Sequence, residues 1–189
     1  MHKLLCPKGL WEKFRAEIGE GSTVFDVGAG YGYASRFVHP SNHYYGIDLN
    51  EKFVQHGRGR GIDLKTADIF DPLVYKESDV FVVVDIIHHI IPQRLRDLFD
   101  LVFAHAKRKV IVIDPGFVSI AKRYGIGGKL LGWIFRILDD DGFQKIKHWM
   151  SDEEYRYLFE TQFGSECGKE FQVNRERVGG YHFVVYTKI

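Results

Sequence analysis

Short apolar runs alternate with amphipathic stretches through most of the chain, which is the pattern of strands and helices in turn. The runs are rich in β-branched residues and apolar at consecutive positions, as expected of parallel strands covered by helices on both faces. Such a chain folds by right-handed crossovers into a parallel sheet that binds ligands outside the carboxyl ends of its strands. The predicted strands are 24–27, 44–47, 62–64, 80–84 and 110–113, and the predicted helices are 8–18, 33–38, 51–56 and 92–103.

Two places depart from this regular alternation. The stretch 70–78 has room for little more than one helical turn, so the crossover to the fourth strand is predicted to be truncated. That would leave one sheet face thinly covered. The run GRGRG at 57–61 is predicted to break the second helix, and its arginines are interpreted as a solvated turn rather than a nucleic-acid contact.

The end of the chain has a different pattern. Ser151 to Glu154 has the form of a capped helix start, and two apolar runs at 171–173 and 181–187 flank a turn near Gly179-Gly180. These runs predict a terminal antiparallel pair. The predicted fold class is therefore α/β: a Rossmann-like, doubly wound, mostly parallel seven-stranded sheet with an antiparallel C-terminal hairpin strand.

Residues 116–149 form an insertion dense in aromatic and aliphatic residues, with basic residues among them. Three interpretations stay open: a helix packed on the thinly covered sheet face, a lid over the substrate, or an amphipathic helix resting on a membrane surface. A partly packed lid is favoured over the extremes. Residues 1–189 are then a single domain, because a chain of this length needs no second core.

Composition narrows the class of protein. The 189 residues are 45% hydrophobic and carry a formal net charge of +1, so no overall field attracts nucleic acid or anionic lipid. Cys6 and Cys167 stand far apart, which argues against a disulfide scaffold or a zinc ribbon. The sequence has no apolar stretch long enough for a secretory signal or a membrane span, so a cytoplasmic location is expected.

The most informative stretch is 24–33, VFDVGAGYGY, an apolar run that breaks into alternating glycines. It predicts a strand, a tight turn and a helix start whose free amide hydrogens suit polar groups of a nucleotide-like ligand. The dinucleotide pattern G-x-G-x-x-G requires a small residue where this chain has Tyr33. The glycines with the preceding Asp26 instead read D-x-G-x-G-x-G.

This pattern resembles motif I of the class I S-adenosylmethionine (SAM)-dependent methyltransferases, of the type 11/12 kind. Asp48 follows about twenty residues past the first glycine, at the end of a strand, where a carboxylate suits a ribose diol. The segment TADIF at 66–70, the strand and loop at 79–89, and the strand at 109–115 extend the resemblance in order and spacing. It covers 22–115 well and includes the terminal hairpin, but matches 116–149 poorly.

The resemblance implies SAM as cofactor and assigns parts of the chain to it. The glycine loop would lie against the cofactor, and Asp48 would bind the ribose hydroxyls. Asp68 with Ile69 would contact adenine. Asp26 and Asp85 would sit near the methionine end, or would merely cap loop amides. The implied cofactor-binding residues are Asp26, Gly28, Ala29, Gly30, Gly32, Asp48, Leu49, Asp68, Ile69 and Asp85.

Two adjacent histidines are the candidate catalytic residues. SAM carries an electrophilic methyl group, so a methyltransferase must hold a nucleophile in line with it and, for a hydroxyl or ammonium acceptor, remove a proton. His88 and His89 follow Asp85 at the mouth of the predicted cleft, and imidazole is a natural general base near neutral pH. The alternative is that they only pack the loop. The sequence has no metal-ligand spacing, so no metal site is predicted.

Two rival functions stay open beside a small-molecule methyltransferase. One is a nicotinamide-dependent oxidoreductase, disfavoured by Tyr33 and by the terminal hairpin. The other is a non-catalytic, methyltransferase-like binding subunit. If the insertion at 116–149 lines the acceptor pocket, the acceptor is apolar or aromatic. Nucleic acid is not expected as a partner, membrane contact is not favoured, and the sequence leaves the oligomeric state open.

Overall fold

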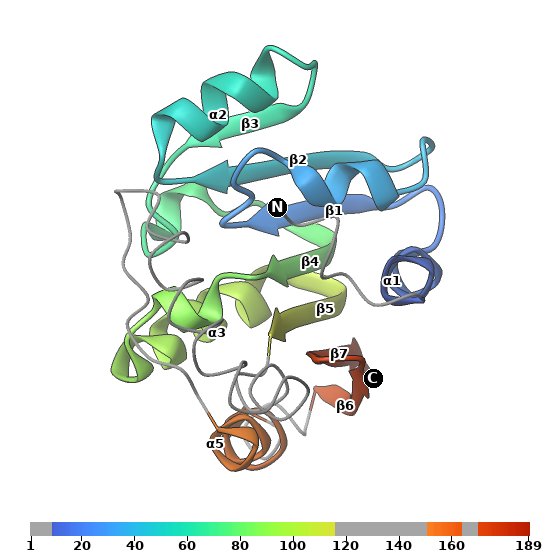
Figure 1. Cartoon of the computed structure of the whole chain (residues 1–189), viewed down its shortest axis with the longest axis vertical. Helices are drawn as coiled ribbons and strands as arrows, with labels where there is room; N and C mark the ends of the chain where they lie inside the picture. The colour runs from blue at the N-terminus through green and yellow to red at the C-terminus, as the bar shows by residue number, and fades with distance from the viewer. Residues whose placement is uncertain (1–8, 116–150, 164–169) are drawn as a thin grey trace, which may run out of the picture.

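The computed structural model describes residues 9–115, 151–163 and 170–189, and in them one seven-stranded sheet runs through the molecule (Figure 1). Its strand order is β3-β2-β1-β4-β5-β7-β6. The strands β1 to β5 are parallel, whereas β7 pairs antiparallel with both β5 and β6. This confirms the predicted fold class. The strands are β1 (Thr23–Val27), β2 (His43–Asp48), β3 (Asp63–Thr66), β4 (Ser78–Val84), β5 (Ala106–Pro115), β6 (Phe171–Val178) and β7 (Tyr181–Lys188).

The helices of the described residues fall close to their predicted positions, although several are not α-helices. The stretch predicted as a helix at 33–38 is a short 3₁₀ helix, and so is the loop that carries the two histidines. The α-helices are α1 (Leu10–Ile18), α2 (Glu51–Arg58), α3 (Pro92–His105) and α5 (Asp152–Arg156). The 3₁₀ helices are η2 (Tyr33–Phe37), η3 (Pro72–Val74) and η4 (Ile87–His89), and η5 (Tyr157–Gln162) is a π-helix.

Both faces of the sheet carry a core, because successive residues of a strand point to opposite sides. In β4, Phe81 and Val83 belong to one core, and Val80 and Val82 belong to the other. All four side chains are fully buried. Burial on both faces explains why the central strand β4 is apolar at consecutive positions from Val80 to Val84.

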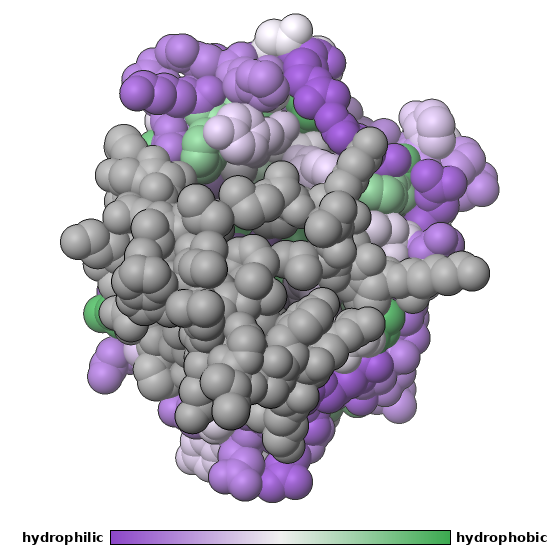
Figure 2. All heavy atoms as spheres, viewed as in Figure 1, coloured by the Kyte–Doolittle hydropathy of each residue, from purple (hydrophilic) through white to green (hydrophobic). Residues whose placement is uncertain are grey.

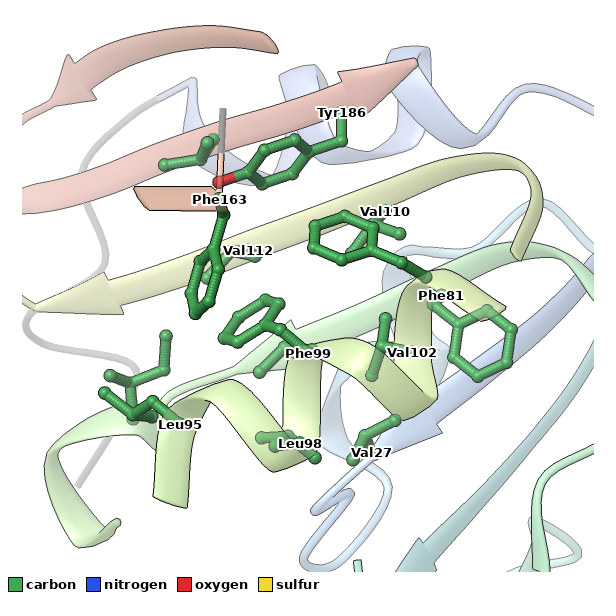
Figure 3. Close-up of a cluster of buried hydrophobic side chains, with 14 of the residues drawn as sticks. Val27, Phe81, Leu95, Leu98, Phe99, Val102, Val110, Val112, Phe163 and Tyr186 are labelled. Carbon is green, nitrogen blue, oxygen red and sulfur yellow. The ribbon is translucent and has the colours of Figure 1, made fainter. Parts of the chain in front are cut away.

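The helix α3 covers the first of these faces. Figure 3 shows Leu95, Phe99 and Val102 of α3 packed over β4 and β5, with Tyr186 of β7 and Phe163 completing the cluster. Removing such side chains from water stabilises the fold by about 1.5–3 kcal/mol each. Pro92 stands in the first turn of α3, where its missing N–H costs no hydrogen bond.

The helix α1 covers the opposite face. Leu10, Phe14 and Ile18 form its buried stripe at helical spacing, as predicted. Trp11 stacks on Phe37 of η2 with ring centroids 4.2 Å apart, which joins α1 to the segment that follows the glycine loop. The N-terminal helix therefore supports the chain immediately behind that loop.

The predicted truncation of the third crossover is confirmed. Between β3 and β4 the chain makes only the single turn η3. Tyr75 follows this turn and is buried, with its ring edge-on to Phe25 and stacked with Phe81. One aromatic side chain thus fills space that a crossover helix would otherwise cover.

The predicted break of the second helix by the run 57–61 is confirmed, although Gly57 itself still lies inside the helix. The helix α2 continues through Gly57 to Arg58 and ends at Gly59. A Cβ at Gly57 would lie 2.3 Å from Leu64 Cδ1 and 3.1 Å from the carbonyl oxygen of Tyr31. Gly57 is therefore needed for close packing inside the helix, a use of glycine that local helix propensity does not reveal.

The predicted cap of α5 is confirmed. Ser151 Oγ accepts from the N–H of Glu154 at 3.2 Å, and the Glu154 carboxylate accepts from the N–H of Ser151 at 2.6 Å, which is a capping box. The Tyr186 hydroxyl donates to the carbonyl of Phe159 in η5 at 2.9 Å. These contacts fix α5 and η5 against β7.

The predicted insertion at 116–149 lies outside the described residues. Within the described part of the chain, no helix has the length and apolar character needed to cross a membrane. Figure 2 shows that the described atoms over α2 and β3, at the top of the view, are mainly hydrophilic.

Candidate cofactor and acceptor site

The glycine loop leaves β1 in a conformation that favours glycine. Gly28, Gly30 and Gly32 all have positive φ angles, 73°, 54° and 72°. A Cβ at Gly28 would also lie 2.6 Å from Ile86 Cδ1, in the segment after β4. The predicted strand and tight turn are therefore confirmed, and the first glycine is needed for two separate reasons.

The neighbouring strand supplies a glycine that the motif did not indicate. A Cβ at Gly46 in β2 would lie 2.7 Å from Ala29 Cβ and 2.9 Å from the carbonyl oxygen of Asp26. The loop thus rests directly on the backbone of β2. No signal in the sequence distinguishes Gly46, because it lies in the middle of a strand.

The amides of the glycine loop itself donate within the protein; the sequence predicts free amide hydrogens only at the start of the helix that follows. The N–H groups of Gly28 and Ala29 both donate to the carbonyl of Ile47, at 2.9 and 2.8 Å, and that of Gly32 donates to Ala29. Because these amides already donate to carbonyl groups of the protein, a ligand would contact the surface of the loop rather than hydrogen-bond to these N–H groups. The 3₁₀ helix η2 that follows has only five residues.

Asp48 is tied to the glycine loop. Its Oδ2 accepts from the N–H of Gly30 at 2.8 Å, and its Oδ1 accepts from the N–H of Asn50 at 2.8 Å. Each carboxylate oxygen can accept a second hydrogen bond, since an ionised carboxylate has about four acceptor positions. Asp48 is half-buried. The two backbone amides therefore hold the Asp48 carboxylate in place beside the glycine loop.

Asp26 lies behind the loop at the end of β1, and only 2% of it is exposed. The Tyr44 hydroxyl donates to its Oδ2. Among the described residues, Oδ1 has no hydrogen-bond partner. Burial raises the pKa of Asp26 from 3.8 to about 7, with the charge of Asp48 adding to the rise and the Tyr44 hydrogen bond opposing it. Tyr44 was not singled out from the sequence.

The predicted adenine-contacting residues lie beside Asp48. The N–H of Ala67, next to Asp68, donates to the carbonyl of Asp48 at 3.0 Å. Asp68 is exposed, and its Oδ1 accepts from the N–H of Phe70 at 2.9 Å. Ile69 is half-buried and Leu49 is 44% exposed. The structure brings together one carboxylate and two apolar side chains at the carboxyl ends of β2 and β3.

A second group of polar side chains lies at the carboxyl ends of β4 and β5. Asp85 follows β4 with a φ of 60°, uncommon for a residue with a side chain, and its N–H donates to Ile113 at 2.8 Å. Nδ1 of the buried His88 lies 3.2 Å from Oδ1 of the buried Asp114. One ligand-type atom each of Asp85, His88 and Asp114 lies within 4.8 Å of the others, a spacing that could hold a cation.

His89 differs from His88 in its surroundings. The two rings lie 4.2 Å apart and are tilted by 42°, but His89 is half-buried whereas His88 is only 2% exposed. Only His88, of the two, contacts Asp114. Both histidines are equal candidates from the sequence, because the sequence does not show which one faces the carboxylate.

One further residue of this group comes from far along the chain. The hydroxyl of Tyr155 in α5 donates to Oδ2 of Asp114. Neither Asp114 nor Tyr155 is among the site residues predicted from the sequence. No pattern in the sequence links two residues that are 41 positions apart.

Known proteins support the class that this geometry indicates. Residues 25–113 match the family model described as a methyltransferase domain. A search of curated proteins finds no match. The structure is similar to magnesium protoporphyrin IX methyltransferase (ChlM) from Synechocystis PCC 6803, with a TM-score of 0.64 and 16% identity, covering 95% of this chain and 80% of that one.

Two further structures are similar over nearly the whole chain. One is a SAM-dependent methyltransferase from Mesorhizobium loti, with a TM-score of 0.64 and 16% identity over 94% of this chain and 97% of that one. The other is the plantazolicin methyltransferase BpumL, with a TM-score of 0.67 and 12% identity over 95% of this chain and 82% of that one. At such identities the likeness establishes the fold.

The methyltransferase-domain model matches residues 25–113, and the fold is that of the class I SAM-dependent methyltransferases. The resemblance predicted from the glycine loop is confirmed, and so are the enzyme class and SAM as its cofactor. The terminal antiparallel pair and the glycine spacing that disfavoured a nicotinamide enzyme agree with this assignment.

Proposed function

We propose that this protein transfers a methyl group from SAM to a small organic molecule, with His88 as the base that removes the acceptor's proton. The observation that carries this proposal is the contact between His88 and Asp114, at the same edge of the sheet as the glycine loop. A buried carboxylate beside an imidazole favours the protonated ring and so favours proton removal.

The cofactor contacts follow from the two carboxylates of β1 and β2. Asp48 would accept hydrogen bonds from the two ribose hydroxyls, since both of its oxygens are fixed by backbone amides. Asp26 would face the methionine end, where its Oδ1 could accept from the amino group. The loop residues Gly28, Ala29, Gly30 and Gly32 would provide the surface beneath the cofactor.

The remaining contacts would be with adenine and with the cofactor's charge. Asp68 would accept from the adenine amino group, with Leu49 and Ile69 on either side of the ring. Asp85 would lie near the methionine end, beside the residues of η4. A carboxylate near a positively charged sulfur would favour binding of SAM.

When bound, SAM supplies a methyl carbon on a positively charged sulfur: the acceptor's lone pair forms a bond to that carbon while the C–S bond breaks and leaves its electrons on sulfur. The chain's part is to hold the acceptor in line and to take its proton. Nε2 of His88 receives that proton, and the resulting imidazolium is stabilised by the carboxylate of Asp114. An acceptor that needs this base carries a hydroxyl or an ammonium group.

Two of the similar structures are named as methyltransferases of organic molecules, magnesium protoporphyrin IX and plantazolicin. These names support a small-molecule acceptor. An apolar or aromatic acceptor, which the residues of 116–149 predicted, is part of the proposal. A cytoplasmic location stays a prediction.

Thermal denaturation with SAM, its demethylated product or NAD tests the cofactor. A ligand at a hundred times its Kd stabilises the folded protein by about 2.7 kcal/mol, so SAM and its product should raise Tm by several degrees while NAD leaves it unchanged. Transfer of label from methyl-labelled SAM into a metabolite mixture then tests the reaction. SAM binding without transfer into any fraction would favour a non-catalytic binding subunit.

A further inference from the structure

Asp114 is fully buried at the end of β5, and three donors converge on its carboxylate. The N–H of Ile87 donates to Oδ1 at 3.1 Å, and the Tyr155 hydroxyl donates to Oδ2. Nδ1 of His88 lies 3.2 Å from Oδ1 and 3.3 Å from Oδ2. A buried carboxylate is tolerated when its oxygens accept such hydrogen bonds. These contacts hold the carboxylate in one orientation, facing the ring.

The contact with Asp114 sets the tautomer of His88. A carboxylate can only accept, so Nδ1 must carry the proton that lies between them. A neutral imidazole has one N–H, and Nε2 therefore keeps its lone pair. We infer that Asp114 and Tyr155 are positioning residues that hold His88 in the tautomer whose Nε2 accepts the proton of the methyl acceptor. This inference rests on the function proposed above.

Tyr155 is well placed to hold Asp114. The capping box at Ser151 fixes the start of α5, and Tyr155 lies one turn later with 1% of it exposed. Burial, followed by the nearby charge of Asp114, raises the pKa of the Tyr155 hydroxyl well above its usual value, so this group remains a donor. Its ring stacks on His182 of β7, with centroids 4.1 Å apart.

His182 lies opposite Asp114 in the β5–β7 register. Burial, with Arg177 as the next cause, lowers the pKa of His182 to about 4. Although its Nε2 lies 3.4 Å from Oδ1 of Asp152, the ring is neutral at neutral pH and forms no ion pair there. His182 therefore acts as an aromatic surface against Tyr155 rather than as a second cation competing for Asp114.

The spacing of Asp85, His88 and Asp114 also fits a cation, and the two arrangements differ in one proton. A cation shared by Asp114 and the near ring nitrogen of His88 would bind Nδ1 and leave the proton on Nε2. The hydrogen-bonded arrangement requires the reverse. The donors from Ile87 and Tyr155 use one acceptor position on each oxygen of Asp114, so the position of the proton on His88 is what distinguishes the two arrangements.

The tautomer of His88 is measurable without a substrate, by long-range ¹H–¹⁵N correlation spectra of the labelled protein. The signals of His88 are assigned by their loss in His88→Gln. We expect a proton on Nδ1 in the wild type, unchanged by a chelator. In Asp114→Asn the side-chain amide can donate to Nδ1, so the proton should move to Nε2. A proton on Nε2 in the wild type, or a tautomer unchanged in Asp114→Asn, would overturn the inference.

The same variants separate positioning from catalysis. Asp114→Asn should lower label transfer from methyl-labelled SAM to a metabolite mixture by about 10²-fold, with SAM affinity within about threefold. If the tautomer changes but transfer does not, His88 is not the base, and the proposed function loses its catalytic residue. If transfer falls without a change of tautomer, the positioning role fails while the proposed reaction stands.

Two more variants complete the test. Asp79→Asn is the matched control, because Asp79 Oδ2 accepts from the Thr23 N–H and hydroxyl, both at 2.8 Å, at the opposite end of β4. It should leave the His88 tautomer and label transfer unchanged. Tyr155→Phe covers the case in which Asp114→Asn fails to fold. It should keep the Nδ1 proton, shift its resonance and lower transfer severalfold, and an unchanged resonance would overturn the role of Tyr155.

Discussion

The candidate site lies along the carboxyl-end edge of the sheet in two parts, here called the β1–β2 edge and the β4–β5 edge, and the two parts are built in different ways. The β1–β2 edge consists of Asp26, the glycine loop and Asp48, and is held mainly by backbone amides. The β4–β5 edge consists of Asp85, His88, Asp114 and Tyr155, and is held by contacts between buried side chains. The first edge comes from two consecutive strands. The second is completed by a helix from the last quarter of the chain.

The difference shows which kind of site a short motif can describe. Backbone conformation in a glycine loop depends on a few neighbouring residues, so the spacing of glycines is enough to indicate it. A buried side-chain cluster depends on strand order and register, which bring Asp114 beside His88 and under Tyr155. Variants at the β1–β2 edge should therefore lose cofactor affinity, whereas variants at the β4–β5 edge should lose turnover.

The largest effect is expected at the β4–β5 edge. His88→Ala should reduce label transfer by about 10²- to 10⁴-fold, because a positioned general base contributes that much, while SAM affinity barely changes. His89→Ala should reduce label transfer much less, since His88 is the histidine that contacts Asp114. Initial rates with methyl-labelled SAM and calorimetry with SAM give both values. Equal, small losses in the two variants would leave both histidines as packing residues.

At the β1–β2 edge, Asp26→Asn should change how stability depends on pH. The pKa of Asp26 is raised from 3.8 to about 7, so the folded protein keeps a proton that the unfolded chain releases. Folding stability from this group is then present in full below the unfolded pKa of 3.8 and is lost as pH rises to about 7. Asparagine does not titrate, so the free energy of unfolding of the variant should rise relative to that of the wild type as pH increases across this range.

Urea unfolding at several pH values measures the difference between the two proteins and cancels the groups they share. Each pKa unit corresponds to 1.36 kcal/mol, which makes a gain of about 4 kcal/mol at pH 8 an upper limit. A difference that stays constant from pH 4 to pH 8 would show that Asp26 is ionised in the folded protein throughout.

Asp48→Ala tests the cofactor contact of the same edge. Hydrogen bonds to a charged group contribute about 1.5–3 kcal/mol, so SAM affinity should fall by roughly ten- to a hundredfold or more. Glu51→Ala removes a nearby carboxylate whose contact is with exposed Gln55, and it should bind SAM normally. Calorimetry on folded protein measures both. Unchanged affinity in Asp48→Ala would remove this residue from the site.

The smallest effect concerns the backbone contact beneath the glycine loop. Gly46→Ala would place a Cβ 2.7 Å from Ala29 Cβ and 2.9 Å from a backbone oxygen, so the loop must shift at a cost of about 1–3 kcal/mol in stability. Gly59→Ala is the control, because a Cβ there meets nothing closer than 3.4 Å and the residue has helical angles. Chemical denaturation should show a loss only for Gly46→Ala.

Much of the β1–β2 edge could be predicted from the sequence. Asp48 was predicted to bind ribose from its distance past the first glycine, and its hydrogen bond to Gly30 shows that the two are indeed joined. The amides of the loop itself are not free, because Ile47 and Asp48 accept from them, and the prediction of free amides concerned only the start of the helix that follows. Which atom accepts from an amide depends on the neighbouring strand, and a motif within one turn does not contain that information.

Glycine also shows where local patterns stop being informative. The glycines of the loop were predicted from their spacing, and their positive φ angles confirm it. The run 57–61 was predicted to break α2, and the helix does end there, but Gly57 lies inside the helix, where Leu64 and Tyr31 leave no room for a side chain. Glycine allows positive φ angles in the loop and close packing at Gly57. Only the close packing depends on residues that are distant in the sequence.

The sequence by itself determined the order of strands and helices, the parallel sheet with its antiparallel ending, and the cofactor loop. These follow from hydrophobic periodicity and from backbone preferences, which act over a few residues. The tertiary structure alone decided that His88 rather than His89 meets Asp114, that Tyr155 holds Asp114, and that Tyr44 meets Asp26. The sheet register and the docking of α5 decide which side chains are buried together. Burial then strengthens the hydrogen bonds and charge interactions between those side chains, because the local dielectric is low.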